Sequence, residues 1–365
     1  MRREWRGAVE LDVSTSEGTI RALAYPELTG RPGTGDRLLL NTSALALGLG
    51  TGGYALVVAI PDRLPPDGDM PGHIVKSRYT PMQVMVASAD EQGSAHHELL
   101  RSADSLDQMP VVVADLHSAL PAVLAGIQGS YRTDRDSAPR VAYVMTDGGA
   151  LPAWFSRTVA GLREAGWLAA TITTGQSFGG DLEAVTVHSG LLTARHVVGA
   201  DIAIVAQGPG NLGTGTRWGF SGVAAGEAVN AAATLHGRPV ASLRLSFADP
   251  RDRHQGVSHH SLTAYGRVAL APADVVLPAL PEPQAARVAA DAAVLAARHR
   301  LVTVSVDGLE EALRSCPVPL STMGRSVAQD LEYFLAAAAA GRHAVSLLGS
   351  EASVLGSLGA RKPRC

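Results

Sequence analysis

The chain has 365 residues and a formal net charge of -3, and 46% of its residues are hydrophobic while 18% are charged. This balance excludes a disordered chain, and the length favours one large domain with a smaller module. The only basic cluster is the short tail at 361–364, so the basic stripe of a nucleic-acid-binding protein is missing and we expect no nucleic-acid partner.

The cysteines and the apolar segments predict the cellular setting. Only Cys316 and Cys365 occur, and the charged residues 1–10 do not form a signal peptide, which together favour a reducing cytoplasm. The most apolar segment, residues 331–340, is bracketed by charges and is shorter than the roughly 20 residues that span a bilayer. It predicts a buried helix, and we expect no contact with a membrane.

Residues 1–62 are dense in turn residues and short alternating apolar runs. This spacing predicts a small β-rich module, either a barrel or a sandwich. The expected strands are at 7–11, 21–25, 37–40 and 54–58. Prolines and glycine in the segment that follows predict a connector up to residue 71.

From residue 72 to 350 the pattern predicts an α/β domain, followed by a flexible tail at 351–365. Short continuous apolar runs alternate with helical stretches, which is typical of βα units around a mostly parallel sheet with helices on both faces, a Rossmann-like, doubly wound fold. The expected strands are 111–114, 140–145, 168–173, 202–206, 240–247 and 301–306. The clearest expected helices are 153–165, 223–235, 284–298 and 327–348. The loops after the strands should gather along one edge of the sheet.

A glycine-rich loop follows the expected strand at 202–206. Such a loop brings backbone N–H groups close to an anion, with threonine hydroxyls as donors and an arginine as countercharge. It matches neither a Walker A loop nor a dinucleotide fingerprint, and an ordinary tight turn is the alternative. The residues expected to bind the ligand here are Gly208, Gly210, Gly213, Thr214, Gly215, Thr216 and Arg217.

A second loop, with Asp147, Gly148 and Gly149, joins the strand at 140–145 to a helix. An aspartate at the carboxyl end of a strand can act as a base, ligate a metal or hold a ribose hydroxyl. It can equally form a local turn in which its carboxylate accepts backbone N–H groups. We expect Asp147 to be catalytic and the two glycines to contact the ligand.

The third loop, 246–261, is unusually polar for a segment that leaves an apolar strand. It predicts acid/base chemistry or phosphate binding, with a solvated surface loop as the alternative. Because His254, His259 and His260 cannot share one helical face, their spacing matches no metal signature and no metal site is expected. The expected catalytic residues are His254, His259 and His260, and the expected ligand-binding residues are Asp249, Arg251 and Ser258.

Weaker candidates also follow expected strands. Asp181 could complete the same cleft, and His117 either joins it or caps a helix. No nucleophile elbow is present and Cys316 lies in no nucleophile motif, so covalent catalysis has no support.

The segments 145–152, 213–222, 246–251 and 256–260 resemble an uncharacterised bacterial family, domain-of-unknown-function family 3866. The resemblance covers most of the chain and includes residues 41–54. It implies neither an activity nor catalytic residues, so the expectations about function rest on the residues themselves.

Together the three loops predict an enzyme that acts on a small anionic, phosphorylated metabolite. Asp147 would be the base or a metal ligand, and the arginines and histidines would hold charge or move protons. The alternative is a sensor or scaffold protein that binds a nucleotide or metabolite without turnover. The pattern names no cofactor, and it is compatible with a homo-oligomer because the helix at 284–298 could pack internally or across a dimer interface.

Overall fold

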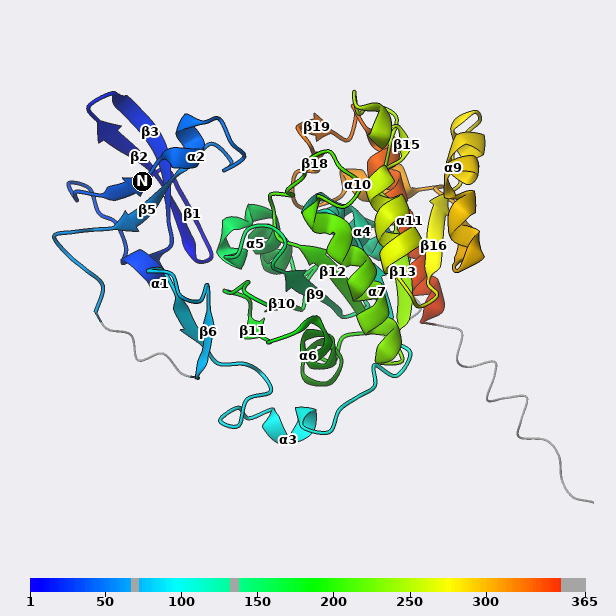
Figure 1. Ribbon diagram of the computed structural model, residues 1–365, viewed down its shortest axis with the longest axis horizontal. Coiled ribbons are helices and arrows are strands. Elements are labelled where there is room, and N and C mark those ends of the chain that lie inside the picture. Colours follow the sequence, from blue (N-terminus) through cyan, green and yellow to red (C-terminus); the bar gives the residue numbers. More distant parts are fainter. Residues whose placement is uncertain (67–71, 132–137, 349–365) are drawn as a thin grey trace, which may run out of the picture.

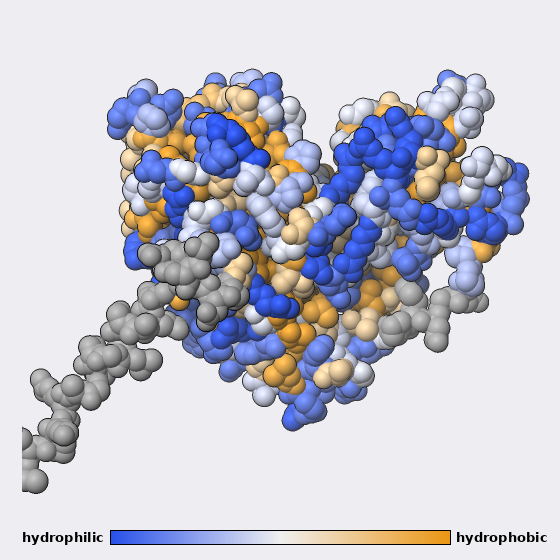
Figure 2. All heavy atoms as spheres, turned by 180° about the vertical axis from the view of Figure 1, so that it is seen from behind, coloured by the Kyte–Doolittle hydropathy of each residue, from blue (hydrophilic) through white to orange (hydrophobic). Residues whose placement is uncertain are grey.

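The computed structural model describes residues 1–66, 72–131 and 138–348, so the expected tail lies outside the described residues (Figure 1). The chain forms two lobes, an N-terminal β module and a larger α/β unit. Seen from behind, a hollow separates the two lobes at one end of the molecule (Figure 2).

The α/β unit is built on a sheet of eight strands, all paired in parallel, as the alternation of apolar runs and helices predicts. Residues 111–113 and 202–205 are fully buried. Their continuous apolar, mostly β-branched side chains are expected in a parallel sheet that is covered on both faces. In sheet order the strands are β11 (Leu182–Glu183), β10 (Ala170–Thr173), β9 (Val141–Thr146), β12 (Ile202–Gln207), β8 (Pro110–Val113), β13 (Arg238–Ser242), β16 (Asp274–Pro278) and β17 (Arg300–Val304).

Helices cover this sheet on both sides. The helices α6 and α7 lie in front of the sheet in Figure 1 and α4 lies behind it, where it packs against α11. The helices of this unit are α4 (Leu120–Gln128), α5 (Arg157–Glu164), α6 (Val187–Leu192), α7 (Ala224–Thr234), α8 (His259–Thr263), α9 (Gln284–Ala292), α10 (Leu309–Arg314) and α11 (Leu331–Leu347).

The alanine-rich helix α11 is buried, as its sequence predicts. Its small side chains let it approach α4 closely: a Cβ at Gly126 would lie only 1.9 Å from the carbonyl oxygen of Ala338. A larger side chain at this crossing would force the two helices apart.

The structure also differs from the expectations. The strand expected at 240–247 ends at Ser242, and residues 245–246 pair instead with Gly256–Val257 as a separate two-stranded ribbon, β14 and β15. The strands β11 and β16 were not placed from the sequence. The strand order also departs from the 3-2-1-4-5-6 order of dinucleotide-binding folds, because β12 lies between β9 and β8.

The N-terminal module is a mixed five-stranded sheet. The described residues show an open order with β1 and β4 at the edges, where a barrel or sandwich was expected, and β3 pairs with β5 in parallel. In sheet order the strands are β1 (Arg3–Trp5), β2 (Ala8–Thr15), β3 (Gly18–Ala24), β5 (Ala55–Ala59) and β4 (Leu39–Asn41), and the short helices α1 (Pro26–Thr29) and α2 (Ser43–Ala46) connect them.

Several contacts attach the N-terminal part of the chain to the α/β unit. The indole N–H of Trp5 donates to the carbonyl of Trp154 at 2.7 Å, and Tyr25 packs against the Trp154 ring. The hairpin of β6 (Ile74–Lys76) and β7 (Val84–Val86) precedes α3 (His97–Leu100) and is fixed by buried Lys76, whose Nζ donates to Glu183 Oε2 at 2.8 Å. None of the helices in the described part of the chain combines the length and the hydrophobicity that a bilayer crossing requires.

Candidate functional site

The carboxyl ends of three adjacent central strands, β12, β8 and β13, carry polar side chains that converge. Asp115 follows β8 and is buried, with only 4% of its surface exposed. The turn that precedes α7 passes directly over it, since a Cβ at Gly222 would lie 3.0 Å from Asp115 Cβ. Phe220, in the same turn, stacks on the His260 ring with 3.7 Å between ring centroids. Segments more than 140 residues apart therefore meet at one edge of the sheet.

Three histidines form the centre of this edge. His254 ends a short 3-10 helix, η5 (Asp252–His254), while His259 and His260 are the first residues of α8. Their ring centroids lie 4.5 to 5.1 Å apart. Ser258 joins the two elements, because its hydroxyl accepts the His260 N–H at 3.2 Å and hydrogen-bonds His254 Nδ1 at 2.7 Å. The three histidines come from two elements, so they lie together although they share no helical face.

Burial keeps the imidazoles of His254 and His259 uncharged near neutral pH. Desolvation lowers the pKa of His254 to about 3, and the positive charge of Arg244 adds to the effect. Desolvation also lowers the pKa of His259 to about 4, with the charge of His260 as the next contribution. Neutral imidazoles can accept a proton, donate a hydrogen bond or ligate a metal.

A buried charge network surrounds the histidines. Arg244, after β13, places Nη1 3.0 Å from His260 Nδ1 and 4.0 Å from Asp115 Oδ2. Asp249 accepts two hydrogen bonds from the Arg251 guanidinium, at 2.8 and 2.7 Å, which hold the pKa of this carboxyl well below its usual range. Arg325 lies between Asp249 and Asp330 and contacts both carboxylates. Asp249 and Arg251, which were both predicted to bind the ligand, therefore form hydrogen bonds with each other.

This edge concentrates buried polar atoms that have no hydrogen-bond partner. Such atoms number eight among the described residues, and four of them belong to this site. They are Asp115 Oδ2, Gln207 Oε1, Arg244 Nη2 and His259 Nε2. Because an unsatisfied buried polar group costs about 1–3 kcal/mol, such a concentration points to a bound water, ion or ligand.

The internal space at this edge is small. A cavity of about 10 Å³ is lined by residues that include Asp115, Gln207 and Ser221. This volume suits roughly one water molecule. The cavity is too small to hold a metabolite.

The glycine-rich loop reaches over the histidine segment. A Cβ at Gly215 would lie 3.8 Å from Arg253 Nη2, and residues 212–218 are exposed. The hydroxyls of Thr214 and Thr216 bond to each other at 3.1 Å and to Gly219, so they close the loop on itself. Gly210 and Gly213 lie at the base of this loop, and Arg217 is exposed at its tip.

The glycines of the second loop serve a close approach of backbones. A Cβ at Gly148 would lie 2.4 Å from Gln207 Oε1, and a Cβ at Gly149 would lie 2.2 Å from the carbonyl oxygen of Gly208. The two loops are also joined by the Ala150 N–H, which donates to the Pro209 carbonyl at 2.7 Å. These glycines therefore let the Gln207 side chain lie against this loop, while its Nε2 donates to the Asp115 carbonyl at 2.9 Å.

Asp147 lies at the rim of the site. It is exposed, and its Oδ2 accepts the Gln176 N–H at 2.8 Å from the loop after β10. In the described residues no hydrogen bond or ion pair joins it to the three histidines. Its catalytic assignment stays a prediction, while Asp115 provides the carboxylate at the centre. Asp115 was not predicted as a site residue, although it follows an apolar run at 110–114 just as Asp147 follows the run at 140–145.

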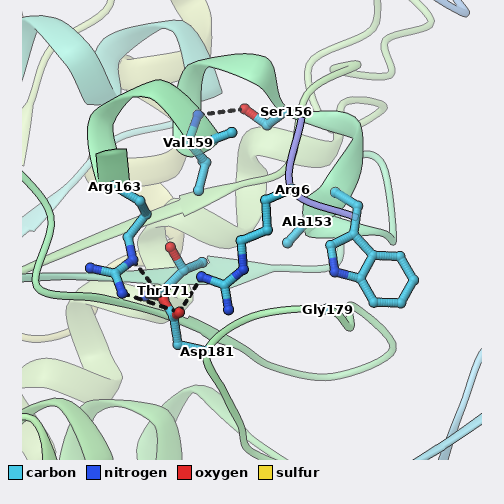
Figure 3. A pocket seen from close by; sticks show the side chains of 10 residues that line it. Arg6, Ala153, Ser156, Val159, Arg163, Thr171, Gly179 and Asp181 are labelled. Carbon is cyan, nitrogen blue, oxygen red and sulfur yellow. Dashed lines mark hydrogen bonds and ion pairs between the residues drawn. The ribbon is translucent and has the colours of Figure 1, made fainter. Parts of the chain in front are cut away.

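The weaker candidates His117 and Asp181 lie outside the histidine cluster. His117 is held between Tyr143 Oη at 3.1 Å and Ser156 Oγ at 2.8 Å, and burial lowers its pKa to about 4. Asp181 belongs to a small pocket of about 20 Å³ between the two lobes (Figure 3).

In that pocket, called here the inter-lobe pocket, both oxygens of Asp181 are engaged. Oδ1 accepts from Arg6, and Oδ2 accepts the Thr171 N–H at 2.7 Å and lies 2.9 Å from Arg163 Nε (Figure 3). Although burial acts to raise the pKa of Asp181, these donors hold it below its ordinary value. The carboxylate ties the N-terminal module to β10 and α5.

Comparison with known proteins identifies the family of the chain. The family model described as "Protein of unknown function (DUF3866)" matches residues 21–341, which include every residue of the site. No curated protein and no solved structure matches the chain. The match spans both lobes and extends well beyond half of the sequence, so the chain belongs to this family, as the resemblance of its loops predicts.

Proposed function

We propose that the protein is an enzyme that acts on a small anionic, phosphorylated metabolite at the carboxyl ends of β8, β12 and β13. The observation that carries the proposal is that four buried polar atoms without a hydrogen-bond partner gather at the carboxyl ends of these three strands. Ligands of parallel α/β sheets bind beyond the carboxyl ends of the strands, and this is where the unsatisfied groups gather.

The charges around the site favour an anion. Arg244 has one guanidinium nitrogen without a hydrogen-bond partner, and among the described residues no carboxylate lies within ion-pair distance of Arg217 or Arg253. Guanidinium groups bind phosphate oxygens in a planar fork. These three arginines would hold the anion, with Arg217 and Arg253 on the glycine-rich loop and its neighbour.

The histidines would supply proton transfer once the anion is bound. A nearby negative charge favours the protonated imidazole, so the pKa of His259 should rise from about 4 toward neutrality in the complex. Asp115 Oδ2 lies 3.5 Å from His260 Nδ1 and would orient that ring. His259 is therefore the proposed general acid or base and Asp115 a positioning residue.

The glycine-rich loop would close over the ligand. Two apolar side chains on it face solvent, Leu212 with 69% and Trp218 with 55% of its surface exposed. Closure over a bound metabolite would remove this surface from water and exclude water from the reacting groups.

Thermal unfolding with inorganic phosphate, pyrophosphate and sugar phosphates tests the binding part of the proposal. An anion at 100 times its Kd should add about 2.7 kcal/mol to the free energy of unfolding. Replacing both exposed arginines (Arg217→Gln with Arg253→Gln) should remove most of this gain. The matched control is Arg314→Gln, because Arg314 pairs with Glu310 and Glu311 on the surface of α10. Equal gains in both variants would contradict an anion site at this edge.

A binding protein without turnover is the second candidate. It is favoured by the low pKa of His259 in the free protein, about 4, which makes this imidazole a weak base at neutral pH. The two functions differ in whether a stabilising ligand is consumed, so each hit from the thermal screen is incubated with the protein and its concentration followed by NMR. A cytoplasmic location and a homo-oligomeric state stay predictions of the sequence.

A further inference from the structure

We propose that His254, His259 and His260 bind one divalent transition-metal ion, at the same edge that would hold the anionic substrate. The catalytic role of this metal rests on the proposed function and would replace proton transfer by His259, because an imidazole nitrogen bound to a metal cannot also accept a proton. Metal binding itself can be measured without any substrate. The ligand set is three imidazoles and no thiolate, which suits zinc, cobalt(II) or iron(II) rather than magnesium or calcium.

The positions of the rings support a shared ion. Each histidine offers one ring nitrogen, and these three nitrogens lie within 4.8 Å of one another. Tetrahedral coordination with bonds of about 2.0–2.1 Å brings such nitrogens to roughly 3.4 Å apart. Small rotations of the rings would close this difference, and the half-buried position of His259 leaves room for them.

The second nitrogens of the rings are placed as in metal sites. His254 Nδ1 is held by Ser258 Oγ, and His260 Nδ1 faces Asp115 and Arg244. This leaves Nε2 of both rings for a metal, beside His259 Nε2, which is buried and has no partner. Partners on the other nitrogen fix the ring orientation and tautomer of metal-binding histidines.

Three arginines oppose a cation at this position, and Arg244 does so most directly because it hydrogen-bonds one of the rings, while the charges of Arg251 and Arg253 also act on the histidines. The hydrogen bond of Arg244 to His260 Nδ1 at 3.0 Å requires the proton on Nε2, the tautomer that cannot bind metal through that atom. Asp115 Oδ2 lies 3.5 Å from the same nitrogen and lacks a hydrogen-bond partner, so it can accept the proton on Nδ1 in the other tautomer. Metal binding should therefore switch this tautomer and depend on the charge of Asp115.

The metal would leave a coordination position for the substrate. Three protein ligands are typical of catalytic rather than structural zinc sites, which are closed by four. Stacked Phe220 covers one face of His260. An oxygen of the anion would occupy the remaining position, where the ion would offset its charge.

The test uses the full chain, stripped with a chelator and dialysed. One equivalent of cobalt(II) or zinc per chain should bind, as measured by mass spectrometry of the loaded protein. Bound cobalt(II) should also give an absorption band in the visible range. Both His259→Gln and Ser258→Ala should lower the affinity about 10-fold or more, the first by removing a ligand and the second by freeing the His254 ring. The matched control His188→Gln replaces an exposed histidine on α6 and should leave binding unchanged.

Circular dichroism and thermal unfolding of each variant precede the titration, and Asp115→Asn gives a second route if His259→Gln does not fold. In Asp115→Asn the affinity should also fall. Failure of the wild-type chain to bind cobalt(II) or zinc, or equal affinity in His259→Gln, Ser258→Ala and the control, would overturn the metal site. Phosphate-dependent stabilisation of the metal-free chain would still support the proposed function in that case, whereas metal binding without any response to anions would leave the metal site and reject the function.

Discussion

The inter-lobe pocket around Asp181 and the edge around Asp115 both bury a carboxylate among arginines, yet they differ in how those groups are satisfied. Both oxygens of Asp181 accept hydrogen bonds from fixed donors, while Asp115 Oδ2 has none (Figure 3). A satisfied carboxylate contributes to the stability of the fold, whereas an unsatisfied one costs stability until something binds. The comparison indicates a structural role for Asp181 and agrees with the role proposed for Asp115 in the site.

The largest expected effect is on the function of the Asp115 edge. Asp115→Asn should lower turnover of the identified substrate by about 100-fold or more, because it removes the charge that orients His260. Asp147→Asn is the matched control at the rim and should cost less. Steady-state kinetics measures kcat for both variants. An equal loss of kcat in both would contradict the assignment of the central carboxylate to Asp115 and favour Asp147 instead.

The second effect concerns stability and is expected at the inter-lobe pocket. Asp181→Asn should lower the free energy of unfolding by about 2 kcal/mol, less than the loss of a fully buried ion pair because Asp181 keeps 17% of its side chain exposed. Urea unfolding measures the change. If Asp115→Asn destabilises the chain more than Asp181→Asn does, the assignment of structure and function to the two carboxylates is reversed.

The third effect is a pH dependence specific to the histidine cluster. Between pH 7 and pH 5 the unfolded chain protonates His254 and His259, whereas the folded chain keeps both neutral because their pKa values are about 3 and about 4. The unfolded state then binds more protons, so the free energy of unfolding falls as the pH falls, by up to about 2 kcal/mol for buried His254 and by less for half-buried His259, whose charge water screens.

Urea unfolding of the metal-free chain at both pH values checks this dependence. The double variant His254→Gln with His259→Gln should lose less stability over the interval than the wild-type chain, while His188→Gln should behave like the wild type. An unchanged pH dependence in the double variant would mean that these imidazoles titrate normally in the folded protein.

The smallest effect is expected in the glycine-rich loop. A phosphorylated ligand that closes this loop should shift the tryptophan emission toward shorter wavelengths, since Trp218 leaves water. The chain has four tryptophans, so Trp218→Phe is needed to isolate the signal. The same shift in this variant would place the response elsewhere.

The architecture of the α/β unit could largely be predicted from the sequence. Buried parallel strands are continuous apolar runs, and helices such as α7 and α11 carry enough small apolar residues to be recognised. The two-residue strand β11 and the ribbon of β14 and β15 could not be predicted, because pairings that short are set by tertiary contacts.

The site could be predicted only in part. The polar loops after β12 and β13 stood out by composition, and the structure brings Gly208, Ser258 and the three histidines to one edge. Asp115, Gln207 and Arg244 were missed because single polar residues at strand ends resemble ordinary turn residues. Their unpartnered state depends on the neighbours that folding supplies, which no spacing in the sequence encodes.

The most direct test of the central claim is NMR of the imidazole nitrogens in protein labelled with ¹⁵N-histidine. Adding inorganic phosphate or pyrophosphate should shift the nitrogen signals of His254, His259 and His260, assigned through the glutamine variants, while those of exposed His188 stay in place. In the metal-free chain a protonated His259 should appear at neutral pH when the anion is bound. If anions leave all three rings unchanged, the edge around Asp115 is no anion site and the proposed function is wrong.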